Sequence, residues 1–490
     1  MTTLTVGTGA GDYASLGAAL AASHDGDTVA LPAGIYLNQT ATVTDNITLQ
    51  GVGGTATLLQ TVPVANAMGI LVVNASGTVT INNVAFIGAA TSNANGANAA
   101  GIRYQGGNLV LNHDSFAYNQ EGILATPSTA GTGTVTLNNS TVTGNGVSDP
   151  TLTSGYGYTH NLYINNVADF SITGSTITAA NIGHEVKSRA LSTSITNSII
   201  ADGPAGTASY GIDLPNAGTA TIQGNTIQKG PAAQNPAVIS NGEEGASNTG
   251  SLAVVGNTIV NNDASPYSVA VINLSTTAAT ITGNSITGLT ASQIDANTAD
   301  TVSGNSIGTG PTVAMQVQID GTTIATGSAT GTTLTTIAAG AGYAALSGIG
   351  TPGLSLDIAA TGSGGHTARF VLSQGGFTAN TAVASFFDTN TGLAGATITW
   401  SVYANADNAA FGTESLLGTA SFIDYGVLVS ASQGFALGFT PSGAYSLTEL
   451  VTITPGALVP EPMSFVLLAA GMAGIALVRR RRRRLARRPG

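Results

Sequence analysis

The stretches of sequence that decide the fold read IQGNTI at 222–227, VVGNTI at 254–259, ITGNSI at 281–286 and VSGNSI at 302–307. The wider pattern is apolar-x-(Gly/Asn)-(Asn/Ser)-x-(Ile/Val), and looser matches to it return every 21 to 35 residues. Its first apolar residues are Ile81, Leu111, Leu137, Ile172, Ile195, Ile222, Val254, Ile281 and Val302. Short strands and small polar turns at such periods are typical of solenoid coils, which bury their apolar sides only by stacking. We therefore predict a right-handed parallel β-helix over residues 37–311.

One polar position of the pattern is also constant in the later coils. Asn225, Asn257, Asn284 and Asn305 occupy the same place in four successive repeats. Stacked coils lie about 4.8 Å apart, which allows one amide to bond to the next. We interpret these asparagines as a structural ladder and exclude them from the candidate site.

The rest of the chain divides into three further parts, so the predicted class is all-β with one helix at the end. Residues 1–36 contain a short amphipathic helix and a first strand, and they resemble the N-terminal cap of pectate-lyase-like β-helices. Such a cap covers the open end of the apolar column. Residues 313–455 alternate apolar and polar residues between Gly, Ser and Thr turns, which favours a β-sandwich with Trp400 in its core.

Charge and cysteine content exclude several functions. Eight of the 13 Lys and Arg residues lie in the last dozen positions, so residues 1–478 carry five basic against 24 acidic side chains. Such a surface repels nucleic acid. The chain has no cysteine, which excludes disulfides, thiolate metal sites and thiol catalysis. We expect a monomer that does not bind nucleic acid.

The C-terminal segment 459–490 combines three signals in order. Val459–Pro462 reads VPEP, residues 463–478 are apolar, and six arginines follow. This resembles the PEP-CTERM sorting signal, which implies an exosortase as partner, a short transmembrane helix, and an exported protein of the cell envelope or extracellular matrix. The apolar run is marginal for a full span of about 20 residues, and the arginines favour the cytoplasmic side. Residues 1–30 show no secretory signal peptide, so we expect an upstream start or another export route.

The few charged residues of the helix are clustered in sequence. His184 follows His160 by 24 residues and Asp213 follows Arg189 by 24, so these side chains are expected to stack on neighbouring coils. Alternation along a strand is expected to place Glu185, Lys187 and Arg189 on the outer face. The predicted catalytic residues are His184, Lys187 and Arg189, and the predicted ligand-binding residues are Arg103, His160, Asn161, Asp213 and Glu243.

This cluster suits an anionic polysaccharide. In a lyase, a Lys or His removes the proton next to a uronate carboxylate while a cation neutralises that carboxylate. The alternative is a solvated ladder of ion pairs, each of which contributes roughly 0 to 1 kcal/mol. The sequence therefore leaves three functions open: a protein that binds or modifies extracellular polysaccharide, a uronate lyase, and a structural or adhesion protein.

Several segments also resemble known β-helix proteins. Residues 100–109, 160–163, 183–190, 206–216 and 234–245 are similar to an uncharacterised proteobacterial β-helix family, which implies the fold and no activity. Glu185–Ser188 is similar to a motif of alginate and chondroitin lyases, which implies calcium held by Glu185 and Lys187 as the base. Those enzymes carry an arginine one coil later, where this chain has Asp213, so Arg189 has to neutralise the substrate if the chain is a lyase.

Overall fold

The computed structural model describes residues 1–455 with short gaps. The gaps are 204–205, 246–248, 264, 309–311, 331–336, 339–342, 351–352, 361–365, 378–380, 389–395, 407–409, 424–428 and 437–444. The predicted sorting segment 459–490 lies outside the described residues. Within the described ranges, no helix has the length and apolar character needed to cross a bilayer.

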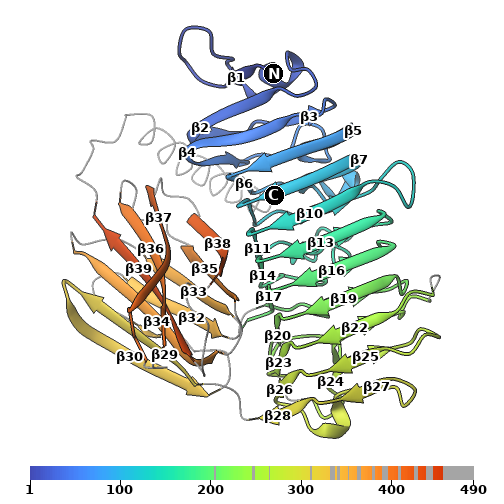
Figure 1. Cartoon of the computed structure of the whole chain (residues 1–490). Coiled ribbons are helices and arrows are strands. Elements are labelled where there is room, and N and C mark those ends of the chain that lie inside the picture. The colour runs from blue at the N-terminus through green and yellow to red at the C-terminus, as the bar shows by residue number, and fades with distance from the viewer. Residues whose placement is uncertain are drawn as a thin grey trace, which may run out of the picture.

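Twenty-eight strands, β1 to β28, pair in parallel and wind into a coil with three faces (Figure 1). We name each face after one of its strands. The β10 face holds β1 (Thr3–Thr5), parts of β2 (Thr28–Leu37), β4 (Thr48–Leu59), β5 (Gly69–Asn82) and β7 (Ala100–Asn112), then β10 (Thr134–Asn138), β13 (Asp169–Thr173), β16 (Ser192–Thr196), β19 (Thr219–Gln223), β22 (Leu252–Val255), β25 (Thr280–Thr282) and β27 (Thr301–Ser303).

The other two faces follow in each coil. The β11 face holds the remaining parts of β2 and β4, then β6 (Val84–Ile87), β8 (Ser115–Ala117), β11 (Thr141–Thr143), β14 (Thr176–Thr178), β17 (Ile199–Ala201), β20 (Thr226–Lys229), β23 (Thr258–Asn261), β26 (Ser285–Thr287) and β28 (Ser306–Gly308). The β15 face holds β3 (Ala41–Val43), parts of β5 and β7, then β9 (Glu121–Ala125), β12 (Leu162–Ile164), β15 (Val186–Ser188), β18 (Ile212–Leu214), β21 (Ala237–Asn241) and β24 (Val269–Asn273).

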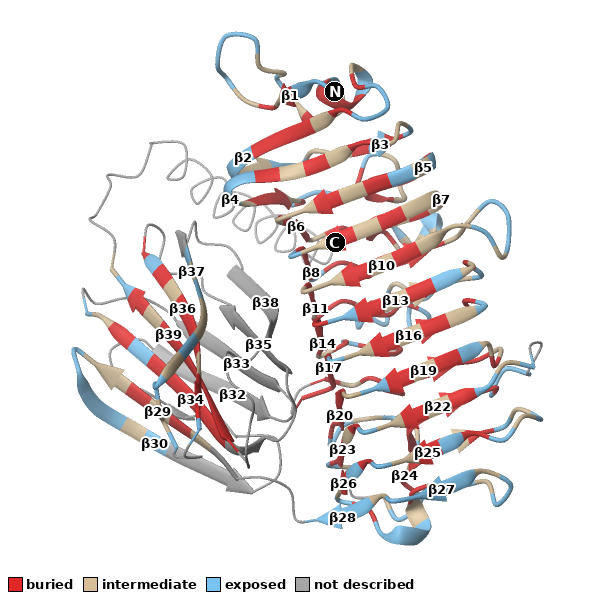
Figure 2. Ribbon diagram, viewed as in Figure 1, coloured by how far each residue is buried: buried red, intermediate tan, exposed pale blue. Residues whose placement is uncertain are grey.

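The predicted repeat positions stack in register on the β10 face. Ile81 pairs with Leu111, and the same register continues through every predicted position to Val302. From Ile81 to Ile281 these side chains are fully buried in one continuous apolar column. Figure 2 shows buried residues recurring along successive coils. The predicted parallel β-helix is confirmed.

The asparagine ladder is confirmed as well, and it lies at the corner between the β10 and β11 faces. Asn225 Nδ2 donates to Asn257 Oδ1 at 3.0 Å, Asn257 Nδ2 to Asn284 Oδ1 at 3.0 Å, and Asn284 Nδ2 to Asn305 Oδ1 at 2.8 Å. Serines extend the column toward the N-terminus, where the hydroxyls of Ser140, Ser175 and Ser198 accept backbone N–H groups. The corner therefore keeps its buried polar groups paired from coil to coil.

A short helix covers the N-terminal end of the coil. Helix α1 (Leu16–Ala21) begins at Ser15, whose side chain caps Ala18 N–H at 3.1 Å. Leu16 and Leu20 are buried in the apolar column. Two 3-10 turns, η1 (Asn93–Asn95) and η2 (Ala291–Gln293), lie in loops.

The C-terminal part forms two further sheets. The first has the order β30 (Thr322–Thr330), β29 (Thr312–Ile319), β34 (Ala368–Phe377), β39 (Tyr445–Thr454), β36 (Thr397–Asn405) and β37 (Ser415–Ile423), all antiparallel. The second has the order β31 (Ile337–Ala338), β32 (Tyr343–Gly350), β33 (Gly353–Ala360), β35 (Thr381–Asp388) and β38 (Val429–Ala436), in which only β33 and β35 are parallel.

The first of these sheets buries Trp400. Its side chain is 1% exposed, and its Nε1 donates to the buried Glu449 carboxylate at 2.7 Å. The second sheet lies beside the β11 face of the helix, where β38 contacts β11 (Figure 1). The β15 face, which carries most of the predicted site residues, is a different side of the coil.

Candidate functional site on the β15 face

One outward column of the β15 face carries the charged residues. Register pairs Tyr163 with Lys187, Lys187 with Asp213, Asp213 with Ser240, and Ser240 with Ile272. The neighbouring Leu162, Val186 and Ile212 belong to the apolar core, so alternation turns the named column outward. Lys187, rather than Arg189, is therefore the residue that stacks on Asp213.

A loop after β21 brings a further carboxylate over this column. Gly242 and Gly245 have φ angles of 83° and 89°, a left-handed conformation that glycine adopts without a Cβ clash. Between them, Glu244 forms ion pairs with both Lys187 and Arg189. Its side chain is 47% exposed, whereas those of Lys187 and Arg189 are 9% and 17% exposed. Two nearly buried cations thus converge on one accessible carboxylate.

The ring of Tyr163 packs against both cations. The Lys187 ammonium lies 5.7 Å from the centre of its ring and the Arg189 guanidinium 5.9 Å, both within range of a cation–π contact. Arg189 Nε also donates to the Tyr163 hydroxyl at 3.0 Å, and Nη1 donates to Asn216. The guanidinium is held in one orientation, and the contact with Glu244 helps raise its pKa against the opposing effect of burial.

Three aromatic rings stack beside the cations. The rings of His160 and His184 lie 4.9 Å apart, and those of His184 and Tyr210 lie 5.2 Å apart. His160 Nδ1 accepts the backbone N–H of His184 at 2.9 Å, and His184 Nδ1 accepts that of Tyr210 at 3.2 Å. Burial, followed by the charge of Lys187, lowers the pKa of His184 to about 3. Burial also lowers the pKa of His160 well below its ordinary value.

These contacts assign the tautomer of His184. With Nδ1 accepting and the ring neutral, the proton sits on Nε2, which points at Asp213 Oδ2 at 3.4 Å. Neither nitrogen of His184 is then placed to accept a proton from a sugar. The geometry gives His184 the task of orienting Asp213.

Asp213 is the chemically unusual group of the cluster. Its side chain is 3% exposed, and Oδ2 lies 3.3 Å from Lys187 Nζ. The other oxygen, Oδ1, is buried and has no hydrogen-bond partner among the residues that the structure describes. Burial raises the pKa of Asp213 to about 6, although Lys187 opposes the shift. A carboxyl with such a pKa can both give and take a proton near neutral pH.

Two predicted site residues lie inside the helix instead. Asn161 Nδ2 donates to Glu185, and Asn161 Oδ1 accepts Asn145 Nδ2 at 2.8 Å, so both belong to an internal polar ladder. Glu185 is fully buried, and it also accepts the N–H of Ala180 at 2.9 Å. Burial and the nearby Asp202 carboxyl raise its pKa well above the ordinary value. The prediction that Glu185 shares the outer face with Lys187 and Arg189 is wrong, and Asn161, which was predicted to bind the ligand, is fully buried in this ladder.

The reason is the length of the strand. Strand β15 spans only Val186–Ser188, so Glu185 lies at the corner before it, where alternation no longer holds. A calcium ion bound by Glu185 would lie in the interior, away from Lys187. In the described parts of the chain, no group of three or more His, Asp or Glu side chains is arranged to hold a metal ion.

Arg103 and Glu243 complete the predicted set. Arg103 lies three coils before Lys187 in the same column, about 14 Å away at the strand spacing. It is half-buried and donates to the Asn98 carbonyl at 2.9 Å. Glu243 accepts the hydroxyl of Tyr210. Sequence reasoning did not select Tyr163, Tyr210 or Asn216. Tyr163 could have been found, because it precedes Lys187 by one coil in the strand register. Tyr210 and Asn216 lie outside the strands, where the repeat gives no signal.

Comparison with known proteins gives a structural likeness but no family. No protein-family model and no curated protein sequence matches the chain. Among solved structures, the chain is similar to a tailspike protein of Acinetobacter baumannii bacteriophage Fri1, described as a capsular polysaccharide depolymerase. The identity is 8% over 88% of this chain and 80% of the tailspike, and the TM-score is 0.32. The function of the β15 face therefore has to be argued from its own side chains.

Proposed function

We propose that the β15 face binds an acidic polysaccharide, with one sugar carboxylate held by Lys187 and Arg189. The observation that carries this proposal is the position of Glu244, whose carboxylate bridges the two cations from an exposed loop. A ligand carboxylate that replaces Glu244 keeps both charges paired. Charge-assisted contacts of this type contribute roughly 1.5 to 3 kcal/mol each.

The surroundings favour a sugar over a free anion. The site lies on a sheet face that continues over successive coils, as an extended polymer requires. Tyr163 offers a ring beside the cations, and Asn216 and Glu243 add hydrogen-bonding groups at the edge. The cations are held by the fold before any ligand arrives, which lowers the entropic cost of binding.

Two variants test the proposal by equilibrium binding to an array of acidic polysaccharides. We expect Lys187→Ala combined with Arg189→Ala to weaken binding more than tenfold, since two charge-assisted contacts are lost. Glu244→Gln is expected to strengthen binding roughly tenfold, about 1.4 kcal/mol, because the ligand no longer displaces a competing carboxylate. A plain network of ion pairs makes the opposite prediction: unchanged binding and a lower melting temperature for Glu244→Gln. That outcome refutes the proposal.

A second function, catalysis on the bound sugar, is favoured by Asp213 alone. Its pKa of about 6 and its unpartnered Oδ1 suit proton transfer, whereas His184 is blocked and Lys187 is paired. Because Oδ1 is buried, this function requires that displacement of Glu244 by the ligand open the site to Asp213. A lyase reaction by this group removes the proton next to the sugar carboxylate that Lys187 and Arg189 neutralise. Asp213→Asn has to abolish such activity while leaving binding of the polymer intact.

We further propose that the protein is exported and associated with the cell envelope through an exosortase and its membrane segment. The support is the order of signals in 459–490, namely Pro-Glu-Pro, an apolar run and an arginine cluster. Deleting 460–490 is expected to release the protein from the membrane fraction. Recovery of the arginine-bearing C-terminus on mature surface protein argues against cleavage and for a permanent anchor.

A further inference from the structure

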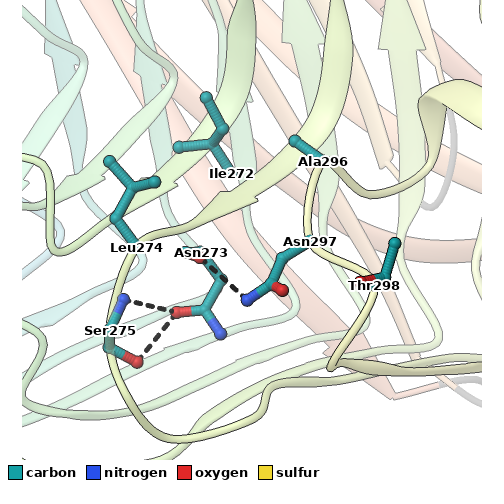
Figure 3. Close-up of a pocket in the computed structure, with 7 residues that line it drawn as sticks. All are labelled: Ile272, Asn273, Leu274, Ser275, Ala296, Asn297 and Thr298. Carbon is teal, nitrogen blue, oxygen red and sulfur yellow. Dashed lines mark hydrogen bonds between the residues drawn. The ribbon is translucent and has the colours of Figure 1, made fainter.

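The far end of the β15 face holds a cavity. The cavity has a volume of about 410 Å³ and is lined by the apolar residues Ile272, Leu274 and Ala296 and by the polar residues Asn273, Ser275, Asn297 and Thr298 (Figure 3). Its volume is in the range of small-ligand sites, roughly 300 to 1,000 Å³. Ile272 belongs to the same outward column as Lys187, three coils further on, which is about 14 Å along the coil.

The polar side of the cavity is rigid. Asn297 Nδ2 donates to the Asn273 carbonyl at 3.1 Å, and Asn297 Oδ1 accepts the N–H of Ala299 at 3.1 Å. Asn273 Oδ1 accepts both the N–H and the hydroxyl of Ser275 (Figure 3). The Asn297 amide keeps a second hydrogen and a second lone pair for a ligand hydroxyl.

The charge at the cavity selects against an acidic ligand. No lining residue is charged. Behind the amides, Asp300 Oδ1 accepts from Asn273 Nδ2 at 2.9 Å, and Asp295 Oδ1 accepts from Asn297 N–H at 3.1 Å. Burial raises the pKa of Asp295 to about 6, and Asp300 also raises it. With one carboxyl bonded to each of these two asparagines, the cavity disfavours a ligand carboxylate and tolerates a neutral hydroxyl group.

We propose that this cavity is a subsite for an uncharged sugar residue. This sugar belongs to the same glycan chain whose acidic sugar is held by Lys187 and Arg189. The apolar side, with Ile272 and Leu274, packs on the C–H face of the sugar ring, and Asn297 and Thr298 bind its hydroxyls. The glycan then runs along the β15 face and carries acidic and neutral residues a few sugar units apart. This inference rests on the proposed function and adds the composition of the ligand.

The test compares polymers of two kinds on the full chain. Hyaluronate, gellan and xanthan carry both acidic and neutral sugars, whereas pectate and alginate are uniformly acidic. Thr298→Trp fills the cavity from an exposed position, and Thr301→Trp, equally exposed on the β10 face, is the matched control. We expect Thr298→Trp to weaken binding to the best mixed polymer at least fivefold and to leave binding to pectate and alginate unchanged. Thr301→Trp should not change binding to any of these polymers.

The outcomes separate the two proposals. If Thr298→Trp binds the best mixed polymer like wild type while the Lys187→Ala, Arg189→Ala variant does not, the subsite is refuted and the proposed function stands. A wild-type chain that prefers pectate or alginate to all mixed polymers also refutes the subsite. If no acidic polymer binds to wild type, the proposed function fails and the subsite fails with it.

Discussion

Replacing Asn257 by Ala tests how much the asparagine ladder stabilises the helix. The Asn257 side chain is 1% exposed and makes four hydrogen bonds. Its Oδ1 accepts from Asn225 N–H at 2.9 Å and Asn225 Nδ2 at 3.0 Å, and its Nδ2 donates to the Ile222 carbonyl at 2.8 Å and Asn284 Oδ1 at 3.0 Å. Each of these hydrogen bonds contributes about 1 kcal/mol, and the substitution also leaves their buried partners unpaired. Asn257→Ala should therefore lower the free energy of unfolding by at least about 4 kcal/mol.

The last coil supplies the control. Asn305 makes similar bonds but is only half-buried, so water can pair with the groups left by Asn305→Ala, and the loss should stay near 1 to 2 kcal/mol. Asn257→Ser should fall between, since Ser198 already fills the same place with one hydroxyl. Urea unfolding followed by far-ultraviolet circular dichroism gives the three free energies. Equal losses for Asn257→Ala and Asn305→Ala would show that burial of the ladder does not set its strength.

Three further predictions concern the site and the second part of the chain. Folding raises the pKa of Asp213 from 3.8 to about 6, so this group destabilises the fold as pH rises from about 4 to about 6. Asp213→Asn removes that effect, so the free energy of unfolding of the variant, relative to that of wild type, should rise by about 3 kcal/mol between pH 4 and pH 6. Urea unfolding at each pH measures this difference. A difference that does not change with pH would contradict the raised pKa of Asp213. Trp400→Phe leaves the buried Glu449 carboxylate without the indole donor and should cost roughly 2 to 4 kcal/mol, with a double-mutant cycle using Glu449→Gln showing the coupling. If Asp213 catalyses elimination, the chain produces ultraviolet absorbance from unsaturated uronate ends, and absence of absorbance with every polymer it binds leaves a binding function.

The coil and its core were predictable because they depend on residues that repeat. Each predicted position from Ile81 to Val302 lies in register, and the Asn225 ladder forms as expected. A repeat can be recognised in a single sequence because stacking requires the same type of residue at the same position of every coil.

The candidate site was predictable only in part. The spacing of one coil correctly brought Asp213 to the cations, although the register pairs it with Lys187 and not with Arg189 as expected. Glu185 was misplaced because the corner begins before the three-residue strand. Glu244 reaches the cations through a glycine turn, and its contact with Lys187 joins residues 57 positions apart. Such contacts depend on how loops fold over a face, which periodicity does not report.

The ladder also bears on how such a chain can grow. Asn257 and Asn284 each accept from the asparagine of the coil before and donate to that of the coil after, although the steps from Asn225 to Asn305 span 32, 27 and 21 residues. A duplicated coil inserted between Asn257 and Asn284 would find a donor on one side and an acceptor on the other, and would leave no buried group unpaired. Tandem duplication in the gene therefore meets no barrier at this corner, whatever the length of the loops. Lengthening by whole coils extends the β15 face, so new copies can diverge while the older ones keep the fold.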